Sequence, residues 1–203
     1  FYMAKIKICG LVRTVDAEAA NRAMPDYVGF VFAKSRRQVL PVQAAQMRVI
    51  LSPKIRAVGV FVNEDPERIR EIVRYCALDL VQLHGQESPE EVERVRDLCG
   101  VGVIKAVHAE EAARWDRSQA DFLLLDQGAG GTGQSFDWGN IPDLRKPYFL
   151  AGGIGLHNLS EALATGAYGV DVSSGAETEG KKDGDKMRRL VERVRKRSEN
   201  GDE

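Results

Sequence analysis

The sequence lacks the features that mark several classes of protein. Its three cysteines are an odd number without metal-ligand spacing, which favours a reducing compartment and argues against a framework of disulfides. No apolar run approaches ~20 residues and no charged-then-apolar leader is found, so we expect no membrane span, no secretion and a cytoplasmic location. The net charge of -1 gives no support for a nucleic-acid or membrane partner.

Motifs for cofactors and metals are missing as well. No G-x-G-x-x-G follows the first predicted strand, and neither a P-loop nor a G-x-S-x-G occurs. No spacing of His, Asp and Glu suggests a metal site. We therefore expect chemistry that needs no cofactor and no metal. An anionic small molecule would need a local positive site on this nearly neutral chain.

What the sequence does contain is an alternation of short apolar segments with helical segments. The apolar segments are expected to form strands within 5–10, 27–32, 57–62, 78–83, 101–107, 122–126, 149–154 and 169–175. Alternation of this kind is typical of a parallel sheet with helices outside it, and eight units indicate a closed barrel. We predict an α/β protein with a single (β/α)8 TIM-barrel domain over 3–198 and a charged C-terminal tail over 199–203.

Several helix boundaries can be predicted from capping residues. Thr14 is the expected N-cap of the helix after the first strand. Ser88 begins a capping box, with Pro89 at the first helical position and Glu91 at the third. The helix between the last two strands is expected from about 156 to 163.

The last two predicted strands end in residues with little or no side chain. Gly152-Gly153 follows the seventh strand, and Ser173-Ser174 follows the eighth. Backbone N–H groups beside a glycine bind phosphate well, because unpaired donors point at the anion. In a (β/α)8 barrel the loops after strands seven and eight commonly hold a substrate phosphate, so we predict a phosphate site here.

Reactive or polar residues end other strands too. Cys9 ends the first strand, Gln82 and His84 end the fourth, and Asp126 ends the sixth. The carboxyl ends of parallel strands meet on the active face of a barrel, so these residues are expected to converge. Plainer interpretations are a buried apolar role for Cys9, backbone contacts for His84, and capping of nearby N–H groups by Asp126.

A thiol base facing a carboxylic acid suits proton transfer at a carbon of a phosphorylated sugar. The leucines before Asp126 favour a partly apolar site that raises the pKa of this carboxyl, so that it can donate a proton. Arg36 and Arg37 are candidates for a substrate carboxylate, since an arginine fork matches carboxylate geometry. From the residues alone we expect an enzyme similar to a phosphosugar isomerase, with its substrate left open.

Short motifs then add a resemblance that extends along nearly the whole chain. They are Lys7-Ile8-Cys9-Gly10, Gly29-Phe30-Val31-Phe32, Lys34-Ser35-Arg36-Arg37, Val58-Gly59-Val60-Phe61-Val62-Asn63, Val81-Gln82-Leu83-His84-Gly85, Gly130-Gly131-Thr132-Gly133 with Phe136-Asp137-Trp138, Leu150-Ala151-Gly152-Gly153 and Asp171-Val172-Ser173-Ser174-Gly175. This ordered set resembles the phosphoribosylanthranilate isomerase family of tryptophan biosynthesis. Any one motif is weak, but their order along the chain is specific.

The resemblance implies a substrate, a reaction and catalytic residues. The substrate would be the phosphorylated aminosugar N-(5-phosphoribosyl)anthranilate. The reaction would be an Amadori rearrangement to an aminoketose, the third step of the tryptophan branch. Asp126 matches the general acid that would protonate the ribose ring oxygen, and Cys9 matches the general base that would remove the proton from C2. Arg37 matches the arginine that would hold the anthranilate carboxylate.

The resemblance implies that no cofactor or metal takes part. It also implies a set of substrate-binding residues: Gln82, His84, Gly131, Gly152, Gly153, Asp171, Ser173 and Ser174. The loops after strands seven and eight would bind the phosphate. The glycine loop around Gly131 would close over the substrate and exclude water.

Two features of the chain bear on these roles. Where the family often has Ser-Pro-Arg-Tyr, this chain has Ser35-Arg36-Arg37-Gln38, so the choice between two adjacent arginines stays open. A free cysteine has a pKa near ~8.5 and is mostly protonated at neutral pH. We therefore expect local positive charge, from Lys7 or a helix N-terminus, to lower the pKa of Cys9.

Other functions have to be weighed against this one. A ribulose-phosphate epimerase-like barrel would need paired acidic residues and metal-binding histidines. Indole-glycerol-phosphate synthase would need a catalytic lysine at a strand end and an N-terminal extension, and we expect this chain to start at its first strand. A sugar-phosphate-binding barrel without turnover, or an isomerase of a related phosphoribosyl aminoaldose, stays open. We expect a monomer or homodimer, and association with other tryptophan-pathway enzymes as a further partner.

Overall fold

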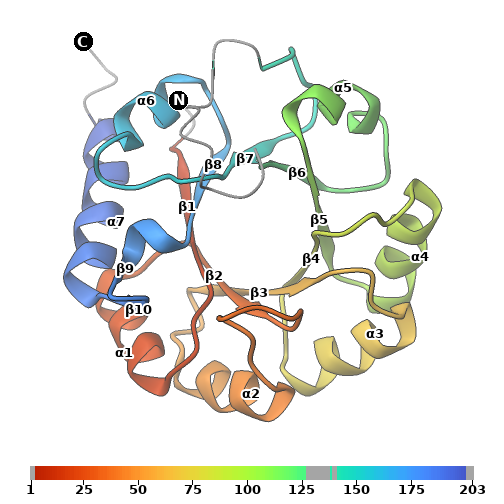
Figure 1. Cartoon of the computed structure of the whole chain (residues 1–203), viewed down its shortest axis with the longest axis horizontal. Helices are drawn as coiled ribbons and strands as arrows, with labels where there is room; N and C mark the ends of the chain where they lie inside the picture. Colours follow the sequence, from red (N-terminus) through yellow and green to blue (C-terminus); the bar gives the residue numbers. More distant parts are fainter. Residues whose placement is uncertain (1–2, 127–137, 139–140, 200–203) are drawn as a thin grey trace.

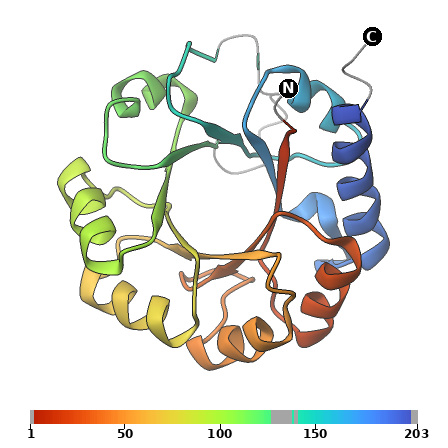
Figure 2. The same cartoon turned by 180° about the vertical axis from the view of Figure 1, so that it is seen from behind.

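The chain forms a closed barrel of eight parallel strands, β1 to β8, in which each strand pairs with its neighbours in sequence and β1 pairs with β8. This computed structural model describes residues 3–126, 138 and 141–199. The strands form an inner ring and the helices an outer ring (Figure 1). Figure 2 shows the same two rings from behind. The predicted (β/α)8 TIM barrel is confirmed.

The strands are short, apolar segments, and their side chains alternate between the barrel interior and the helix layer. They are β1 (Lys5–Cys9), β2 (Tyr27–Val31), β3 (Arg56–Phe61), β4 (Leu80–Leu83), β5 (Gly102–Val107), β6 (Phe122–Leu125), β7 (Tyr148–Leu150) and β8 (Gly169–Val172). Alternation puts Lys7 and Cys9 on the same face of β1. In register, Lys7 lies beside Tyr27 on β2 and Asp171 on β8.

The helices cover the outside of the barrel with their apolar faces. They are α1 (Thr14–Ala23), α2 (Pro41–Ile50), α3 (Pro66–Tyr75), α4 (Pro89–Cys99), the one-turn η1 (Ala109–Glu111), α5 (Ala112–Trp115), α6 (Leu159–Ala164) and α7 (Gly184–Glu199). The predicted capping box of α4 is confirmed. Ser88 Oγ accepts from the backbone N–H of Glu91 at 3.2 Å, and the Glu91 carboxylate accepts from the N–H of Ser88 at 2.7 Å.

The predicted N-cap of α1 is wrong by one residue. Thr14 is the first helical residue, and Arg13 occupies the N-cap position. The carboxylate of Asp16 satisfies the first N–H groups instead, because its Oδ2 accepts from Val12 at 3.0 Å and from Arg13 at 2.9 Å. A carboxylate in the first helical turn also interacts favourably with the helix dipole.

The helix between β7 and β8 starts later than predicted, at Leu159. Asn158 holds the preceding segment as a turn. Its Oδ1 accepts from the N–H of Gly155 at 2.9 Å, and its Nδ2 donates to the carbonyl of Gly153 at 3.2 Å. Side chains of this kind offer the backbone an alternative to helical hydrogen bonds, so the helix begins only after the turn.

Aromatic side chains fill the interior of the barrel near the amino ends of the strands. They are Tyr27, Phe122, Phe149 and Tyr168, which we call the aromatic layer. The ring centroids of its contacting pairs lie 5.0 to 5.7 Å apart, in edge-on or tilted arrangements that aromatic rings favour. The hydroxyls of Tyr27 and Tyr168 are 2.7 Å apart. The polar strand ends lie at the opposite end of the barrel.

An antiparallel hairpin follows β8 and the one-turn η3 (Ser174–Ala176). Its strands are β9 (Glu177–Thr178) and β10 (Lys181–Lys182). In Figure 1 it lies at the rim of the barrel close to α1 and α7. Residues 200–203 of the predicted tail lie outside the described residues. Among the described residues, no helix is both long enough and apolar enough to cross a membrane.

Candidate active site

A cavity of about 390 Å³ lies among the carboxyl ends of the strands. It is lined by every predicted site residue that the structure describes: Cys9, Arg37, Gln82, His84, Asp126, Gly152, Gly153, Asp171, Ser173 and Ser174. Gly131 lies outside the described residues. The convergence expected from the strand ends therefore occurs, and it joins segments from both ends of the chain.

Cys9 lies directly above a buried ion pair. Lys7 is fully buried, and its Nζ donates to Asp171 Oδ1 at 2.9 Å. Because Lys7 and Asp171 are register partners on adjacent strands, the backbone itself fixes this pair. The charge of the Lys7 ammonium acts on the Cys9 thiol and lowers its pKa. The thiol therefore lies near a cation whose position is fixed by the sheet.

The balance of burial and charge decides how acidic Cys9 is. Burial raises its pKa, because a thiolate loses hydration inside the barrel. The charge of Lys7 lowers this pKa and that of Asp171 raises it, and burial prevails. Our expectation of a lowered pKa is therefore wrong in its net direction. Lys7 itself stays charged: burial alone would lower its pKa, but Asp171 and Cys9 together raise it.

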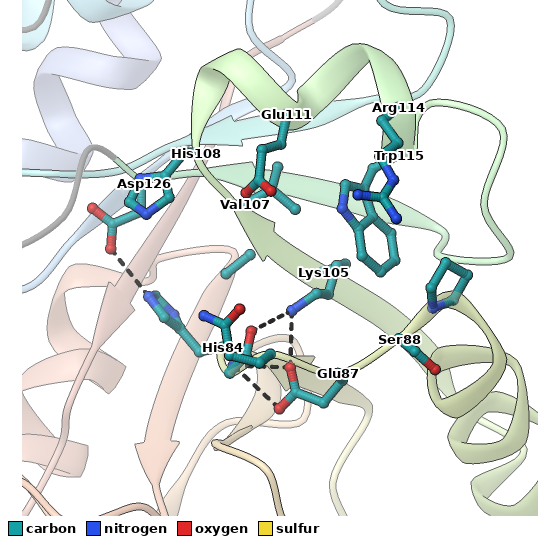
Figure 3. A pocket seen from close by; sticks show the side chains of 14 residues that line it. His84, Glu87, Ser88, Lys105, Val107, His108, Glu111, Arg114, Trp115 and Asp126 are labelled. Carbon is teal, nitrogen blue, oxygen red and sulfur yellow. Dashed lines mark hydrogen bonds and ion pairs between the residues drawn. The ribbon is translucent and has the colours of Figure 1, made fainter.

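Asp126 belongs to a hydrogen-bonded chain of three side chains. His84 Nε2 lies 3.1 Å from Asp126 Oδ2 (Figure 3). His84 Nδ1 lies 2.9 Å from Gln82 Nε2. With the Gln82 amide as donor, Nδ1 is the acceptor and Nε2–H donates to the carboxylate. The Asp126 N–H is bonded to the carbonyl of Val107 at 3.0 Å. These hydrogen bonds orient the Asp126 carboxylate at the cavity wall.

The two adjacent arginines occupy different positions. Arg37 lines the cavity, whereas Arg36 does not and its side chain is 53% exposed. Both bind Glu177, which sequence reasoning missed together with its neighbour Lys182. Two-residue strands such as β9 and β10 carry too little periodicity to be predicted. The placement favours Arg37 over Arg36 as the contact for a substrate carboxylate.

The loops after β7 and β8 contact each other beside the cavity. Gly152 and Gly153 have φ values of 90° and 68°, in the left-handed region that glycine adopts without strain. Gly175 approaches the Ile154 carbonyl so closely that a Cβ at this position would overlap the oxygen. Glycine therefore allows two segments of backbone to lie side by side, as a phosphate site made of backbone N–H groups requires.

A second cavity, of about 450 Å³, adjoins the first at His84 and Asp126 (Figure 3). Lys105 lies in its wall, on the outward face of β5, and its Nζ donates to Glu87 at 2.8 Å and to the carbonyl of Gly85 at 2.8 Å. The Glu87 carboxylate also accepts from the N–H of Gly85. This buried pair holds the loop that carries His84.

The groups suited to an anionic ligand are cations and backbone donors. Lys34 and Arg37 line the cavity together with the glycine loops. Within the part of the chain that the structure describes, no group of three or more His, Cys, Asp or Glu side chains is arranged to hold a metal ion. A thiol, a carboxylate and an anion-binding wall can together bind a phosphorylated substrate and transfer protons.

Comparisons with known proteins agree with this chemistry. A family model described as N-(5'phosphoribosyl)anthranilate (PRA) isomerase matches residues 6–193. The chain is similar to N-(5'-phosphoribosyl)anthranilate isomerase of Streptococcus pneumoniae (strain Taiwan19F-14), with 42% identity over 196 residues that cover 95% of this chain and 96% of the relative.

Solved structures give the same result. One is a phosphoribosyl anthranilate isomerase in complex with reduced 1-(o-carboxyphenylamino)-1-deoxyribulose 5-phosphate, with a TM-score of 0.82 and 35% identity over 95% of this chain and 98% of that one. Another, of monomers of the dimeric enzyme from Thermotoga maritima, has a TM-score of 0.82 and 35% identity over 96% of this chain and 99% of that one. By sequence and by structure, the chain belongs to the phosphoribosylanthranilate isomerase family.

Proposed function

We propose that the chain converts N-(5'-phosphoribosyl)anthranilate into 1-(o-carboxyphenylamino)-1-deoxyribulose 5-phosphate, the third step of the tryptophan branch. Cys9 is the general base and Asp126 the general acid. The observation that carries these roles is that the thiol and the carboxylate line one cavity from different strands, β1 and the end of β6. A relative in complex with the reduced form of this product supports the substrate assignment.

Asp126 starts the reaction by giving a proton to the ribose ring oxygen. The bond between C1 and this oxygen breaks, and the lone pair of the anilino nitrogen forms a C=N bond, which leaves a protonated Schiff base. Asp126 becomes a carboxylate in the same step. The N–H of His84, 3.1 Å away, then stabilises that carboxylate, because hydrogen bonds to the charged form favour it.

Cys9 completes the rearrangement as a thiolate. It takes the proton from C2, and the C–H electron pair forms a double bond between C1 and C2 while the nitrogen becomes neutral. The resulting enolamine tautomerises to the ketone. The thiol must first lose its own proton, and the buried Lys7 ammonium stabilises the thiolate that remains. No electron is gained or lost overall, so the chemistry requires no redox cofactor.

Other groups hold the substrate during these steps. Arg37 binds the anthranilate carboxylate, and backbone at Gly152-Gly153 and Ser173-Ser174 binds the phosphate. Gln82 contributes an acceptor: among the described residues, nothing donates to its buried Oε1, which a hydroxyl of the opened sugar would satisfy. His84, after β4, and Asp171, on β8, contact the substrate from opposite sides of the same cavity.

Turnover of freshly generated N-(5'-phosphoribosyl)anthranilate, followed by the loss of substrate fluorescence, tests the proposal. The wild type should turn over, and Cys9→Ala and Asp126→Asn should each be slower by about 100-fold or more, as loss of a general acid or base implies. Cys99→Ala is the matched control, because this half-buried thiol lies at the end of α4. A wild type that binds inorganic phosphate but does not turn over would instead be a binding barrel or an isomerase of another aminoaldose.

Assembly and location are proposed from the family. A relative from Thermotoga maritima is described as dimeric, and we infer that this chain is a monomer or a homodimer. Sedimentation equilibrium distinguishes the two states. A cytoplasmic location, and association with other enzymes of tryptophan biosynthesis, are part of the same proposal.

A further inference from the structure

Three cations converge on the carboxylate of Glu177. Arg36 Nη2 donates to it at 2.6 Å, Arg37 Nε at 2.7 Å and Lys182 Nζ at 2.8 Å. Glu177 is only 7% exposed, and Lys182, its register partner in the hairpin, is 8% exposed. One carboxylate among three cations leaves two positive charges uncompensated within this cluster, beside a cavity suited to an anion.

Glu177 cannot move easily, because Lys182 ties it to the catalytic end of the barrel. Lys182 Nζ also donates to the carbonyl of Ser173 at 3.0 Å. Ser173 Oγ in turn donates to the carbonyl of Cys9 at 3.2 Å. The hairpin is therefore connected through hydrogen bonds to the loop after β8 and to the end of β1. A carboxylate held in this way is a fixed partner for any side chain that it binds.

Glu177 binds Arg37 along one edge of the guanidinium. It accepts from Nε at 2.7 Å and from Nη2 at 3.2 Å. Nη1 is not one of the two nitrogens that bind Glu177, and Arg37 lies in the cavity wall. The guanidinium is planar and rigid, so fixing one edge fixes the direction of the other. A prepositioned arginine loses less side-chain freedom when a ligand binds.

We propose that Glu177 is a positioning residue that holds Arg37 for the substrate carboxylate, and that the β9–β10 hairpin thereby sets specificity for an aminosugar bearing an aromatic acid. This inference rests on the proposed function, since it names the carboxylate that Arg37 receives. Lys182 keeps the Glu177 carboxylate in place, so that the substrate adds to Arg37 and does not displace its partner. The hairpin thus contributes to recognition without touching the reacting atoms.

Two ligands that differ by one carboxyl group test the proposal. They are reduced 1-(o-carboxyphenylamino)-1-deoxyribulose 5-phosphate and its phenylamino counterpart without the carboxyl. Glu177→Gln should raise the Kd of the carboxylated ligand about tenfold and that of the other ligand less than about twofold. In an Arg37→Gln background, Glu177→Gln should have no further selective effect. Glu179→Gln, at the turn of the same hairpin, should bind both ligands like the wild type.

Three results would overturn the proposal. If Glu177→Gln weakens the binding of both ligands equally, Glu177 has a purely structural role. If it tightens the binding of the carboxylated ligand, Glu177 competes with the substrate. If it changes neither Kd, Arg37 needs no partner. Circular dichroism checks each fold. Should Glu177→Gln not fold, Glu177→Asp, which keeps the charge on a shorter side chain, should show a smaller selective loss. A wild type that neither turns over nor binds either ligand contradicts the proposed function itself.

Discussion

Lys7 and Asp171 lie side by side in register on β1 and β8, and their side chains form an ion pair of 2.9 Å inside the barrel. Lys7 is fully buried, and the Asp171 side chain is 10% exposed. The same pair joins the first strand to the last and brings a positive charge to Cys9. The contact therefore bears on the stability of the barrel and on the charge beside the proposed base.

Replacing Lys7 with methionine should lower the free energy of unfolding by about 3–5 kcal/mol, because the largely buried Asp171 carboxylate loses its cation. Urea unfolding followed by circular dichroism measures the change. Arg68→Met, which breaks an exposed pair with Glu71, should cost less than about 1 kcal/mol. The double variant Lys7→Met/Asp171→Leu should regain stability relative to Lys7→Met. If the double variant loses as much free energy of unfolding as Lys7→Met and Asp171→Leu lose together, the pair is not coupled.

The activity should depend on pH through Cys9. Burial raises the pKa of this thiol, so the fraction of enzyme with the active thiolate grows as pH rises through and beyond the ordinary thiol range. The profile of kcat/KM in the free enzyme should therefore still be rising at the usual pKa of cysteine. Cys9→Ala should lose this limb along with its activity. A wild-type profile that is flat from neutral pH upwards would contradict the raised pKa.

Acid should destabilise the protein through Glu177. Burial alone would raise its pKa, but hydrogen bonds from Arg37, Lys182 and Arg36 lower it from 4.5 to about 2. A depressed folded-state pKa contributes stability above pH 4.5 that is lost as pH falls toward 2. The loss amounts to at most about 3 kcal/mol. Glu177→Gln should remove this part of the pH dependence, and unfolding curves between these pH values check it.

A methyl group at Gly175 should separate the loops after β7 and β8. Its Cβ would overlap the Ile154 carbonyl oxygen, so one backbone segment must shift. We expect Gly175→Ala to lose about 1–3 kcal/mol of stability, as overpacking generally does, and to weaken phosphate binding. Isothermal titration with inorganic phosphate measures the binding.

Gly102→Ala is the control for that variant, because the nearest atom to its Cβ would be 3.4 Å away, at ordinary contact distance. Gly102 is the first residue of β5 and lies at the opposite end of the barrel from the cavity. Phosphate affinity that is equal in both variants would show that the loops after β7 and β8 do not form the phosphate site.

Sequence reasoning predicted the barrel and the convergence of the strand-end residues on one cavity, because both follow from local patterns. Apolar runs identified the strands, and the rule that parallel strands end on one face brought Cys9, Gln82 and Asp126 together. The capping box at Ser88 uses contacts within four residues, so it could be predicted from the sequence as well.

Features that depend on distant segments could not be predicted. The pairing of Lys7 with Asp171 depends on the register of strands 164 residues apart. The pKa of Cys9 depends on its depth in the barrel, which outweighs the charge that its sequence neighbour supplies. Glu177 was missed because its hairpin is too short to have a period, although its partners Arg36 and Arg37 were both singled out.

The aromatic layer also bears on proton exchange inside the barrel. Tyr27 and Phe149 are almost wholly buried, and Ile104 and Leu124 pack in the same cluster. This layer fills the barrel interior toward the amino ends of the strands, and Cys9 lines the cavity at the carboxyl ends. In the proposed reaction the hydron from C2 moves to the Cys9 thiol under the bound substrate, and we expect it to exchange with solvent more slowly there than it would on a surface thiol. When the enolamine tautomerises, a hydron is added at C1. We therefore expect part of a deuterium label placed at C2 to appear at C1 of the product, and a product without label at C1 would show that the hydron exchanges with solvent first.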